Sequence, residues 1–346
     1  MTPRVHQLLA AAAPNDAVTN QAIAWRSVLA AAGIGGEIAA EHIHPEMAGV
    51  VTPLDSLADD GAPIILRYSI WSRALERARA WSGRVGIVYH NITPPHLVGS
   101  GNPVVAELCA RGRRELPSLA KVATLVVADS TYNAEDLVRA GYATPVTIPL
   151  LLDLPDPPPA RPDAPPTVLY VGRIAPSKRI EDVIATVAAV RERYVPDATL
   201  DLVGAHHDHP AYHEALVAYV GDLGLGGAVR FRGRVDDAER DHAYRTSGAY
   251  LSMSEHEGFC APLLEAMAMG LPVIARGAGA VPETVGDAGL VVHDRDIALA
   301  AAAVARVLHD PAVRQGLADN ARARLADVSP DAVGPRVIDA VSEFIS

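Results

Sequence analysis

The chain has 346 residues, a length that suits two domains of ordinary size better than one compact core. Apolar residues make up 49% of it, so two cores can be filled, while the formal net charge of −11 argues against a nucleic-acid binder, which would carry a basic domain or stripe. The two cysteines, Cys109 and Cys260, lie in different halves of the chain. That usage is typical of a reducing compartment and argues against a disulfide framework or a cysteine-based zinc site.

The N-terminal half alternates short apolar runs with alanine-rich helical patterns, which is typical of a parallel sheet built from β-α-β units. The first 18 residues predict a strand and its loop, because their apolar run is too short to span a bilayer and lacks a convincing cleavage signal. We therefore expect a cytoplasmic protein. In chain order, this half predicts strands at 4–10, 62–69, 85–90, 123–129 and 145–151, and helices at 20–32 and 133–140.

Residues 151–166, LLDLPDPPPARPDAPP, form the one marked change of composition. Proline fixes φ and removes an amide donor, so we predict a semi-rigid linker between two α/β domains. Open α/β sheets bind ligands outside the carboxyl ends of their strands, so site residues should follow strands closely. After the linker, the pattern predicts strands at 167–172, 198–204, 229–233, 249–254, 271–276 and 289–292, and helices at 180–194, 212–223, 297–308, 311–326 and 330–345.

Two glutamates, Glu257 and Glu265, stand in the stretch SEHEGFCAPLLEAMAMGLPVIARG. A helix that starts near Pro262 places the first glutamate in a loop and the second near the end of the first helical turn. Helix starts favour anions, and carboxylates accept hydrogen bonds from hydroxyl pairs, so we expect a polyol site beside an anion site. The alternative is a solvated loop residue and a favourable first-turn charge. The backbone amides expected to receive ligand oxygens are those of Phe259, Cys260 and Ala261.

The loop after the strand at 167–172 carries two cations. Gly172 ends the strand, and Arg173 and Lys178 follow it. A guanidinium and an ammonium near a departing nucleoside diphosphate lower the barrier by stabilising its negative charge. The alternative for Lys178 is a solvated surface position, and we expect Arg179 on the surface.

These motifs resemble a known family. EGFCAPLLEAMAMGLPVIA followed by GAVPETVGDAGLVV is similar to the nucleotide-diphospho-sugar signature of retaining glycosyltransferases of family 4 (glycosyl transferases group 1), and VLYVGRIAPSKRIEDVI, YHNITPP and DSTYNAEDL extend the resemblance over nearly the whole chain. The resemblance implies the GT-B fold, an α/β architecture of two Rossmann-like parallel-sheet domains facing across a cleft. It implies an acceptor-side domain at 1–155, a nucleotide-sugar-binding domain at 156–328, and a helix at 329–346 that packs back toward the N-terminal domain.

The resemblance also implies roles for individual residues. Glu257 would hold hydroxyls of the transferred sugar near its 3- and 4-positions, and Glu265 the ribose hydroxyls. His90, at a strand end, would position the reacting sugar, although a lone strand-end histidine is otherwise most often structural. The implied catalytic set is His90, Glu257, Arg173 and Lys178, with the last two on the diphosphate; the donor-binding set is Gly172, Val235, Gly258, Phe259, Cys260, Ala261, Leu264 and Glu265; the acceptor side is Asn15, Asp16 and Asn91.

Two positions depart from the family pattern. Cys260 stands where glycine is common, so the approach of the backbone to a ligand is expected to differ there. The segment APNDAVTNQ, which contains Asn15 and Asp16, replaces the usual Gly-Gly loop after the first strand. In the family that loop usually meets the phosphate or the acceptor, so we expect this contact to differ in this chain.

The implied reaction transfers a hexosyl unit from a nucleotide diphosphate sugar to the hydroxyl of a sugar, lipid-linked or small-molecule acceptor, with retention of the anomeric configuration, in glycan or glycoconjugate synthesis. UDP, GDP, dTDP and ADP sugars all stay open as donors. We expect no cofactor or essential metal, because the histidines at 206–213 and the run Asp294 to Asp296 fit solvated loops better than a ligand set. A nucleotide-sugar epimerase or phosphorylase, and a non-catalytic sugar-nucleotide binder, stay open as alternatives.

The segment 71–84, WSRALERARAWSGR, places Trp71 and Leu75 near one side of a helix and its arginines elsewhere. This pattern indicates a solvated surface helix, with weak peripheral contact at the inner face of an anionic membrane as the alternative. The sequence carries no prediction of oligomeric state.

Overall fold

The computed structural model describes residues 3–98, 102–159 and 163–346. The chain divides into two compact units. Part of the predicted linker, 160–162, lies outside the described residues. Unit 1 comprises Met1–Pro95, Val104–Asp153 and Asp327–Ser346, and unit 2 comprises His96–Pro103 and Leu154–Ala326.

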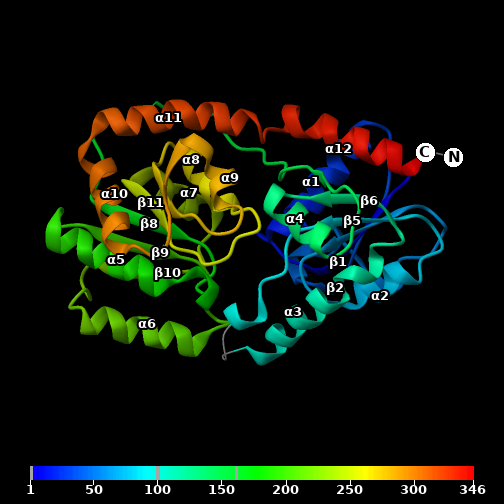
Figure 1. Ribbon diagram of the computed structural model, residues 1–346, viewed down its shortest axis with the longest axis horizontal. Coiled ribbons are helices and arrows are strands. Elements are labelled where there is room, and N and C mark those ends of the chain that lie inside the picture. The colour runs from blue at the N-terminus through cyan, green and yellow to red at the C-terminus, as the bar shows by residue number, and fades with distance from the viewer. Residues whose placement is uncertain (1–2, 99–101, 160–162) are drawn as a thin grey trace. The chain divides into compact units, whose positions relative to one another are not determined.

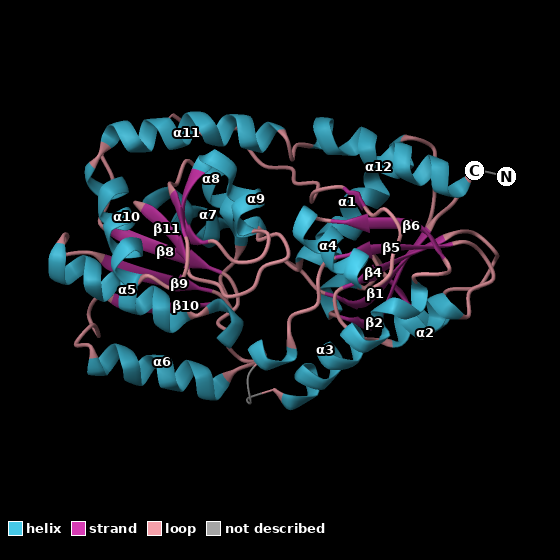
Figure 2. Cartoon of the chain, in the orientation of Figure 1, coloured by secondary structure: helices cyan, strands magenta, loops and turns pink. Residues whose placement is uncertain are grey.

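Unit 1 is a seven-stranded, all-parallel sheet with strand order β3-β2-β1-β4-β5-β6-β7. Every residue of β4 and β5 is buried, as expected when helices cover both faces of a parallel sheet (Figure 2). The strands are β1 His6–Ala12, β2 Ile38–Ile43, β3 Thr52–Pro53, β4 Ile64–Tyr68, β5 Val85–Tyr89, β6 Ala123–Ala128 and β7 Val146–Thr147; the helices are α1 Ala17–Ala31, α2 Arg73–Arg79, α3 Pro103–Glu115, α4 Thr131–Arg139 and α12 Pro330–Ile345.

The last helix of the chain, α12, belongs to unit 1, where it lies beside α1 (Figure 1). Its buried residues follow helical spacing and therefore form one apolar stripe. The stripe packs into the core that contains Trp25 of α1 and Val127 of β6. The residues of α12 in that core are Val333, Val337, Val341 and Phe344.

Three sequence expectations for unit 1 differ from the structure. The strands β2 and β3 were not predicted, because IAAEHI is rich in alanine, a residue that is depleted in strands, and β3 has only two residues. The strand expected at 145–151 is reduced to β7, Val146–Thr147, at the edge of the sheet. Pro149 follows it and cannot donate to a strand ladder.

Unit 2 is a six-stranded parallel sheet with strand order β10-β9-β8-β11-β12-β13, and all six strands were predicted. Helices cover both of its faces (Figure 2). Its strands are β8 Thr167–Val171, β9 Thr199–Val203, β10 Val229–Gly233, β11 Ala249–Ser252, β12 Val273–Arg276 and β13 Gly289–Val292; its helices are α5 Ile180–Arg193, α6 Pro210–Asp222, α7 Asp237–Thr246, α8 Ala261–Ala268, α9 Val281–Val285, α10 Ile297–His309 and α11 Pro311–Ala326.

The strand order of unit 2 shows which loops lie where a ligand is expected to bind. In unit 2 the chain builds outward from β8 to β10 and then crosses to β11 on the other side of β8, so the order reverses between β8 and β11. Open α/β sheets bind ligands at such a switch point, outside the carboxyl ends of the strands. The loops that leave the sheet there are 172–179 and 253–260. Unit 1 has the same kind of switch point between β1 and β4.

No helix within the described ranges has both the length and the apolar character needed to cross a membrane.

Candidate functional site

An ion pair joins the two loops at the unit 2 switch point. Lys178 lies at the end of a short 3-10 helix, Pro176–Lys178, and its Nζ is 2.7 Å from Oε1 of Glu257. The two side chains are 19% and 10% exposed. The backbone also connects the loops, because the amide of Glu255 donates to the carbonyl of Ser177. A carboxylate and an ammonium are therefore held together where the fold is expected to bind a ligand.

The environment of Glu257 keeps its carboxylate ionised. Burial by itself would raise the pKa of Glu257, but the positive charge and hydrogen bond of Lys178, the hydrogen bond from Ser254 and the charge of His256 outweigh it. The pKa of Glu257 therefore lies below its ordinary value. An ionised carboxylate only accepts hydrogen bonds, so Glu257 suits the binding of hydroxyls and does not suit a role as general acid.

Helix α8 starts beside this ion pair with an unusual backbone. Its N-cap, Cys260, has φ +74°, in the left-handed region, and makes no side-chain capping bond. That conformation explains why glycine is common at this position in the family the sequence resembles. Burial, followed by the charge of Glu257, raises the pKa of the Cys260 thiol well above its ordinary value. Pro262 has no amide hydrogen and the amide of Leu263 donates to the carbonyl of Cys260, so in the first helical turn the amide of Ala261 is the one left for an oxygen of a ligand.

The loop after β12 fixes the backbone around Glu257. Gly279 has φ +59°, and a Cβ there would lie 2.2 Å from the carbonyl oxygen of Glu257. The amide of Ala280 donates to that same oxygen, and the Thr284 hydroxyl donates to the carbonyl of Phe259. The motif GAGAVPE, residues 277–283, therefore packs closely against the backbone of the loop that carries Glu257.

Glu265 lies farther along α8 and contacts a different neighbour. Its Oε2 accepts a hydrogen bond of 2.9 Å from the hydroxyl of Tyr244 in α7. Burial raises the pKa of Glu265, although the charge of Arg240 and the Tyr244 hydrogen bond oppose part of the rise. The two glutamates of the motif thus have different surroundings, one beside an ammonium and one beside a phenol.

The other predicted donor-binding residues differ in how exposed they are. Arg173 is exposed and has no side-chain ion pair with any described residue. Gly172 has φ +154°, and its carbonyl approaches Gly204 so closely that a Cβ on Gly204 would lie 1.8 Å from it. Val235 is half-buried after β10. Leu264 is completely buried, so its side chain belongs to the core of unit 2.

Arg179, expected on the surface, is instead half-buried with φ +51°. Its guanidinium forms ion pairs with Glu181 at 3.1 Å and with Asp182 at 3.2 Å. Arg295 also grips Asp182, through two hydrogen bonds of 2.6 Å. These ion pairs fix the turn that carries Lys178 into α5.

In unit 1, His90 follows β5 and is held at both ring nitrogens. Its Nδ1 is 2.7 Å from Oδ2 of Asp129, which follows β6, and its Nε2 is 3.3 Å from Nη1 of Arg67 in β4. A guanidinium only donates, so Nε2 accepts and the ring proton lies on Nδ1, which donates to Asp129. The side chain of His90 is 5% exposed. Both nitrogens of the imidazole are therefore engaged within unit 1.

Arg67 is a buried cation in β4 that was not among the predicted site residues. Its Nε donates to Oε1 of Gln7 at 2.7 Å, its Nη2 is 3.4 Å from the carbonyl of Gln21, and its guanidinium stacks 4.7 Å from the centre of a Trp25 ring. Burial lowers the pKa of Arg67 to about 9, and the charge of Asp129 opposes that fall. A charged residue inside the apolar run IILRY was the sequence signal for it.

The residues predicted on the acceptor side have local structural roles. Asp16 caps α1, where its Oδ2 accepts from the amide and the hydroxyl of Thr19, both at 2.8 Å. Asn15 before it has φ +61° and is exposed. Asn91 has φ +67°, and its Nδ2 donates to Oδ1 of Asn133 at 2.7 Å. A role toward an acceptor stays a prediction for these three residues.

The histidines after β9 stack on one another. His206 and His213 have ring centroids 4.0 Å apart at an interplanar angle of 15°, and His213 meets Phe231 edge-on at 4.9 Å. Burial and the neighbouring His206 lower the pKa of His213. Within the described ranges, no group of three or more His, Cys, Asp and Glu side chains is arranged to hold a metal ion.

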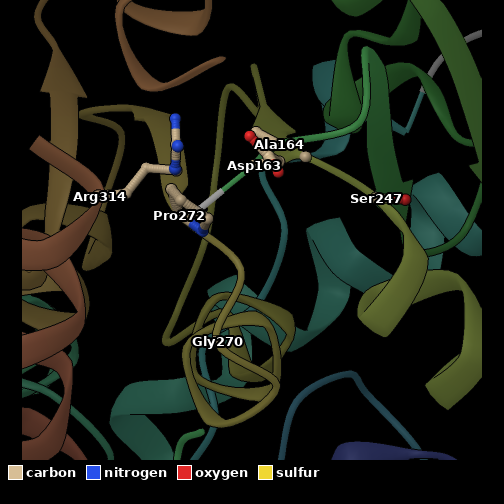
Figure 3. A pocket seen from close by; sticks show the side chains of 7 residues that line it. Asp163, Ala164, Ser247, Gly270, Pro272 and Arg314 are labelled. Atoms are coloured by element: carbon tan, nitrogen blue, oxygen red, sulfur yellow. The ribbon is translucent and has the colours of Figure 1, made fainter. Parts of the chain in front are cut away.

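Unit 2 also contains a small hollow (Figure 3). Arg314 lines it and donates to the carbonyls of Val307 and Leu308. Several lining residues immediately precede β8, β11 and β12, so the hollow lies at the amino ends of strands, the edge opposite the ion pair. The residues around it are Asp163, Ala164, Ser247, Gly248, Gly270, Pro272 and Arg314.

Comparison with known sequences identifies the C-terminal part of the chain. Residues 156–324 match the family described as Glycosyl transferases group 1. D-inositol 3-phosphate glycosyltransferase of Frankia alni is 36% identical over 166 residues, which cover 46% of this chain and 40% of that protein. A GDP-mannose-dependent alpha-(1-6)-phosphatidylinositol monomannoside mannosyltransferase of Mycobacterium tuberculosis is 36% identical over 167 residues, covering 44% and 41%. These matches span about two fifths of the relatives' length.

Solved structures match the whole chain at low identity. Sucrose-phosphate synthase from Thermosynechococcus elongatus superposes with a TM-score of 0.77 at 20% identity, covering 99% of both chains. Anabaena Alr3699/HepE, solved in complex with UDP and glucose, gives a TM-score of 0.77 at 18% identity and covers 99% of this chain and 100% of that one. Together with the two parallel sheets, these matches confirm the predicted fold class of two Rossmann-like domains. Residues 156–324 are therefore a domain of the glycosyl transferases group 1 family, in a chain with the GT-B fold.

Proposed function

We propose that the protein is a retaining glycosyltransferase of family 4 that moves a hexosyl unit from a nucleotide diphosphate sugar to an acceptor hydroxyl in glycan or glycoconjugate synthesis. The observation that carries the proposal is the Lys178–Glu257 ion pair at the unit 2 switch point, beside the uncapped start of α8. The names of the relatives support it, since one is GDP-mannose-dependent and Anabaena Alr3699/HepE was solved with UDP-glucose.

In this proposal the donor is held along its length by complementary groups. The diphosphate meets Lys178, Arg173 and the amides at the start of α8, where positive charge stabilises the departing phosphate. Glu257, ionised by its surroundings, accepts hydrogen bonds from hydroxyls of the transferred sugar. Glu265 accepts from the hydroxyls of the ribose. A diphosphate that binds Lys178 competes with Glu257 for it, which couples the phosphate and sugar ends of the site.

We assign His90 to positioning of the reacting sugar and not to general-base catalysis. Its Nε2 faces a guanidinium and its Nδ1 donates to Asp129, so neither nitrogen is placed to take a proton from an acceptor. The acceptor's proton passes instead to the phosphate oxygen that leaves. The bond between the anomeric carbon and that oxygen breaks as the bond to the acceptor oxygen forms on the same face of the sugar, which retains the configuration. No metal or cofactor enters these steps.

The acceptor is a sugar, a lipid-linked molecule or a small molecule. The arginines of segment 71–84 bind other groups of the chain, which argues against peripheral contact with an anionic membrane. Arg73 pairs with Asp55 at 2.6 Å, and Arg79 pairs with Glu115 at 2.8 Å. Arg77 donates to a backbone carbonyl and stacks on Trp81, and Arg84 donates to the carbonyl of Phe344.

The test is release of nucleoside diphosphate from a panel of UDP-, GDP-, dTDP- and ADP-hexoses with candidate acceptors. The chain has only two lysines, Lys178 and Lys121, and Lys121 is exposed, which offers a matched control. Loss of a charged hydrogen bond of about 1.5–3 kcal/mol should lower kcat/KM roughly ten- to a hundredfold in Lys178→Met and in Glu265→Ala, with Lys121→Met unchanged.

Product analysis separates the proposal from its alternatives. NMR of the new glycosidic bond should show the donor's anomeric configuration, and an inverted product would refute retention. Conversion of a nucleotide sugar to its epimer without any acceptor would instead identify an epimerase. Release of a sugar phosphate would identify a phosphorylase. Tight donor binding without turnover across all acceptors would identify a non-catalytic binder.

A further inference from the structure

Three buried tyrosines of unit 2 donate hydrogen bonds around the candidate site. The hydroxyl of Tyr170 in β8 donates to the carbonyl of Arg173 at 3.2 Å, and that of Tyr250 in β11 donates to the carbonyl of Val171 at 3.0 Å. Tyr244 in α7, which is 0% exposed, donates to Oε2 of Glu265 at 2.9 Å. Burial raises the pKa of all three phenols well above 10, so each stays a donor.

Among these three residues, Tyr244 alone bonds a carboxylate of the candidate site. The other two bond backbone carbonyls of β8 and of the loop after it. The ring of Tyr244 is fixed by stacking on Tyr250, with centroids 6.2 Å apart and an interplanar angle of 28°. The hydroxyl of this ring lies 2.9 Å from Oε2 of Glu265 and 3.5 Å from the carbonyl of Pro262, so the shorter bond goes to Glu265. That bond restricts the orientation of Glu265 and leaves Oε1 as the oxygen for a ligand.

The Tyr244 hydrogen bond affects the ionisation of Glu265, because other groups around this carboxylate oppose its charged form. Burial disfavours its ionised form, while the Tyr244 hydroxyl and the charge of Arg240 favour it. Asp237 and Asp241, also on α7, oppose ionisation by like charge, and Tyr250 from β11 lies in the same electrostatic environment. Tyr244 is thus one of two groups that keep a buried carboxylate able to accept hydrogen bonds.

We propose that Tyr244 is a positioning residue for recognition of the ribose of the donor nucleotide. It orients Glu265 so that the remaining carboxylate oxygen meets the ribose hydroxyls, without itself touching the ligand. The inference rests on the proposed function, since it takes Glu265 as the ribose-binding group.

The experiment compares each of UDP, GDP and ADP with its 2′,3′-dideoxy form by isothermal titration of the full chain. The ratio of the two dissociation constants reports recognition of the ribose hydroxyls alone. Wild type should prefer the ribose form at least roughly tenfold, and Tyr244→Phe should reduce that preference by roughly three- to tenfold. Tyr250→Phe, which removes a buried hydroxyl from the ring that stacks on Tyr244, is the matched control and should leave the ratio unchanged.

Two further measurements separate positioning from general loosening of the fold. In a Glu265→Ala background, Tyr244→Phe should leave the ratio unchanged, because the group it orients is gone. With Tyr244→Phe alone, the pKa of Glu265 rises further, so the ribose preference should be lost at a higher pH than in wild type. Incorporation of 3-fluorotyrosine at position 244 keeps the hydroxyl and makes it a stronger donor; it should widen the ratio, and it serves as the test if the Phe variant does not fold.

Each outcome decides the question. A ratio that falls in Tyr244→Phe and holds in Tyr250→Phe supports the inference. A ratio that changes equally in both variants, or in neither, overturns it while nucleotide binding by wild type keeps the proposed function standing. If wild type binds neither these three diphosphates nor dTDP, both the inference and the proposed function fail.

Discussion

Removal of the Lys178 ammonium should destabilise unit 2 in a way that depends on pH. Lys178→Met keeps most of the side-chain volume but leaves the Glu257 carboxylate, which is 10% exposed, without its cation. Glu257 would then keep the hydrogen bonds from Ser254 and from the Cys260 thiol, and the charge of His256. Its buried charge would be poorly compensated, which is the costly case for a broken ion pair.

The magnitude follows from the geometry. At 2.7 Å and an effective dielectric constant of about 20, the attraction between the two charges is roughly 6 kcal/mol, much of which is cancelled by their desolvation. Removal of one partner of a buried pair costs about 3–5 kcal/mol. We expect about 3 kcal/mol, because Ser254 still donates to the carboxylate. At about 2–4 °C per kcal/mol, Tm should fall by roughly 6–12 °C.

The pH dependence has a definite sign. In wild type the pKa of Glu257 is lower in the folded than in the unfolded state, so its stabilisation is present above the unfolded pKa and is lost as pH falls through the folded one. In Lys178→Met, burial dominates and the folded pKa rises, so the carboxyl takes up a proton in mild acid. The stability difference between the two proteins should therefore be largest near neutral pH and shrink as the pH falls toward 5.

Urea denaturation at pH 7.5 and pH 5 measures this difference. Lys121→Met, the same substitution at an exposed position, should change stability by less than about 0.5 kcal/mol. Lys178→Met/Glu257→Gln should recover most of the lost stability, since no buried charge remains, but it should not recover transferase activity. A loss below about 1 kcal/mol, or one that is the same at both pH values, would refute a buried, coupled pair.

Three further predictions concern the backbone and unit 1. Asp129→Asn should lower kcat roughly ten- to a hundredfold with little change in the donor KM, because a charge-assisted bond of about 1.5–3 kcal/mol to His90 is lost; equal kinetics would remove His90 from the mechanism. Gly279→Ala should cost at least about 2 kcal/mol more than Gly224→Ala in thermal unfolding, since both have positive φ but only the first places a Cβ against a carbonyl oxygen; equal losses would disprove the close contact. At φ +74°, Cys260→Gly should be more stable than Cys260→Val by at least about 1 kcal/mol, and the reverse order would show that the left-handed backbone is absent.

Local sequence patterns correctly predicted many of the helices and strands. The helices at Pro311–Ala326 and Pro330–Ile345 begin and end where they were predicted, because proline starts each of them and an apolar stripe runs through it. The strand at Ile38–Ile43 was missed, because it pairs with β1 despite a composition that does not favour strands. Arg179 was misplaced, since nothing near it in the sequence indicates that an arginine would adopt positive φ.

The sequence predicts that strands and helices alternate, that a proline-rich linker joins two α/β domains, and that Glu257 lies in a loop before a helix that carries Glu265. Which side chains contact one another could be learned only from the tertiary structure. Lys178 and Glu257 are 79 positions apart, and Gln7 and Arg67 are 60 apart. The reason is physical: hydrophobic periodicity reports how each segment is solvated locally, whereas contacts across the sheet depend on strand order, which only the packing of the whole domain selects.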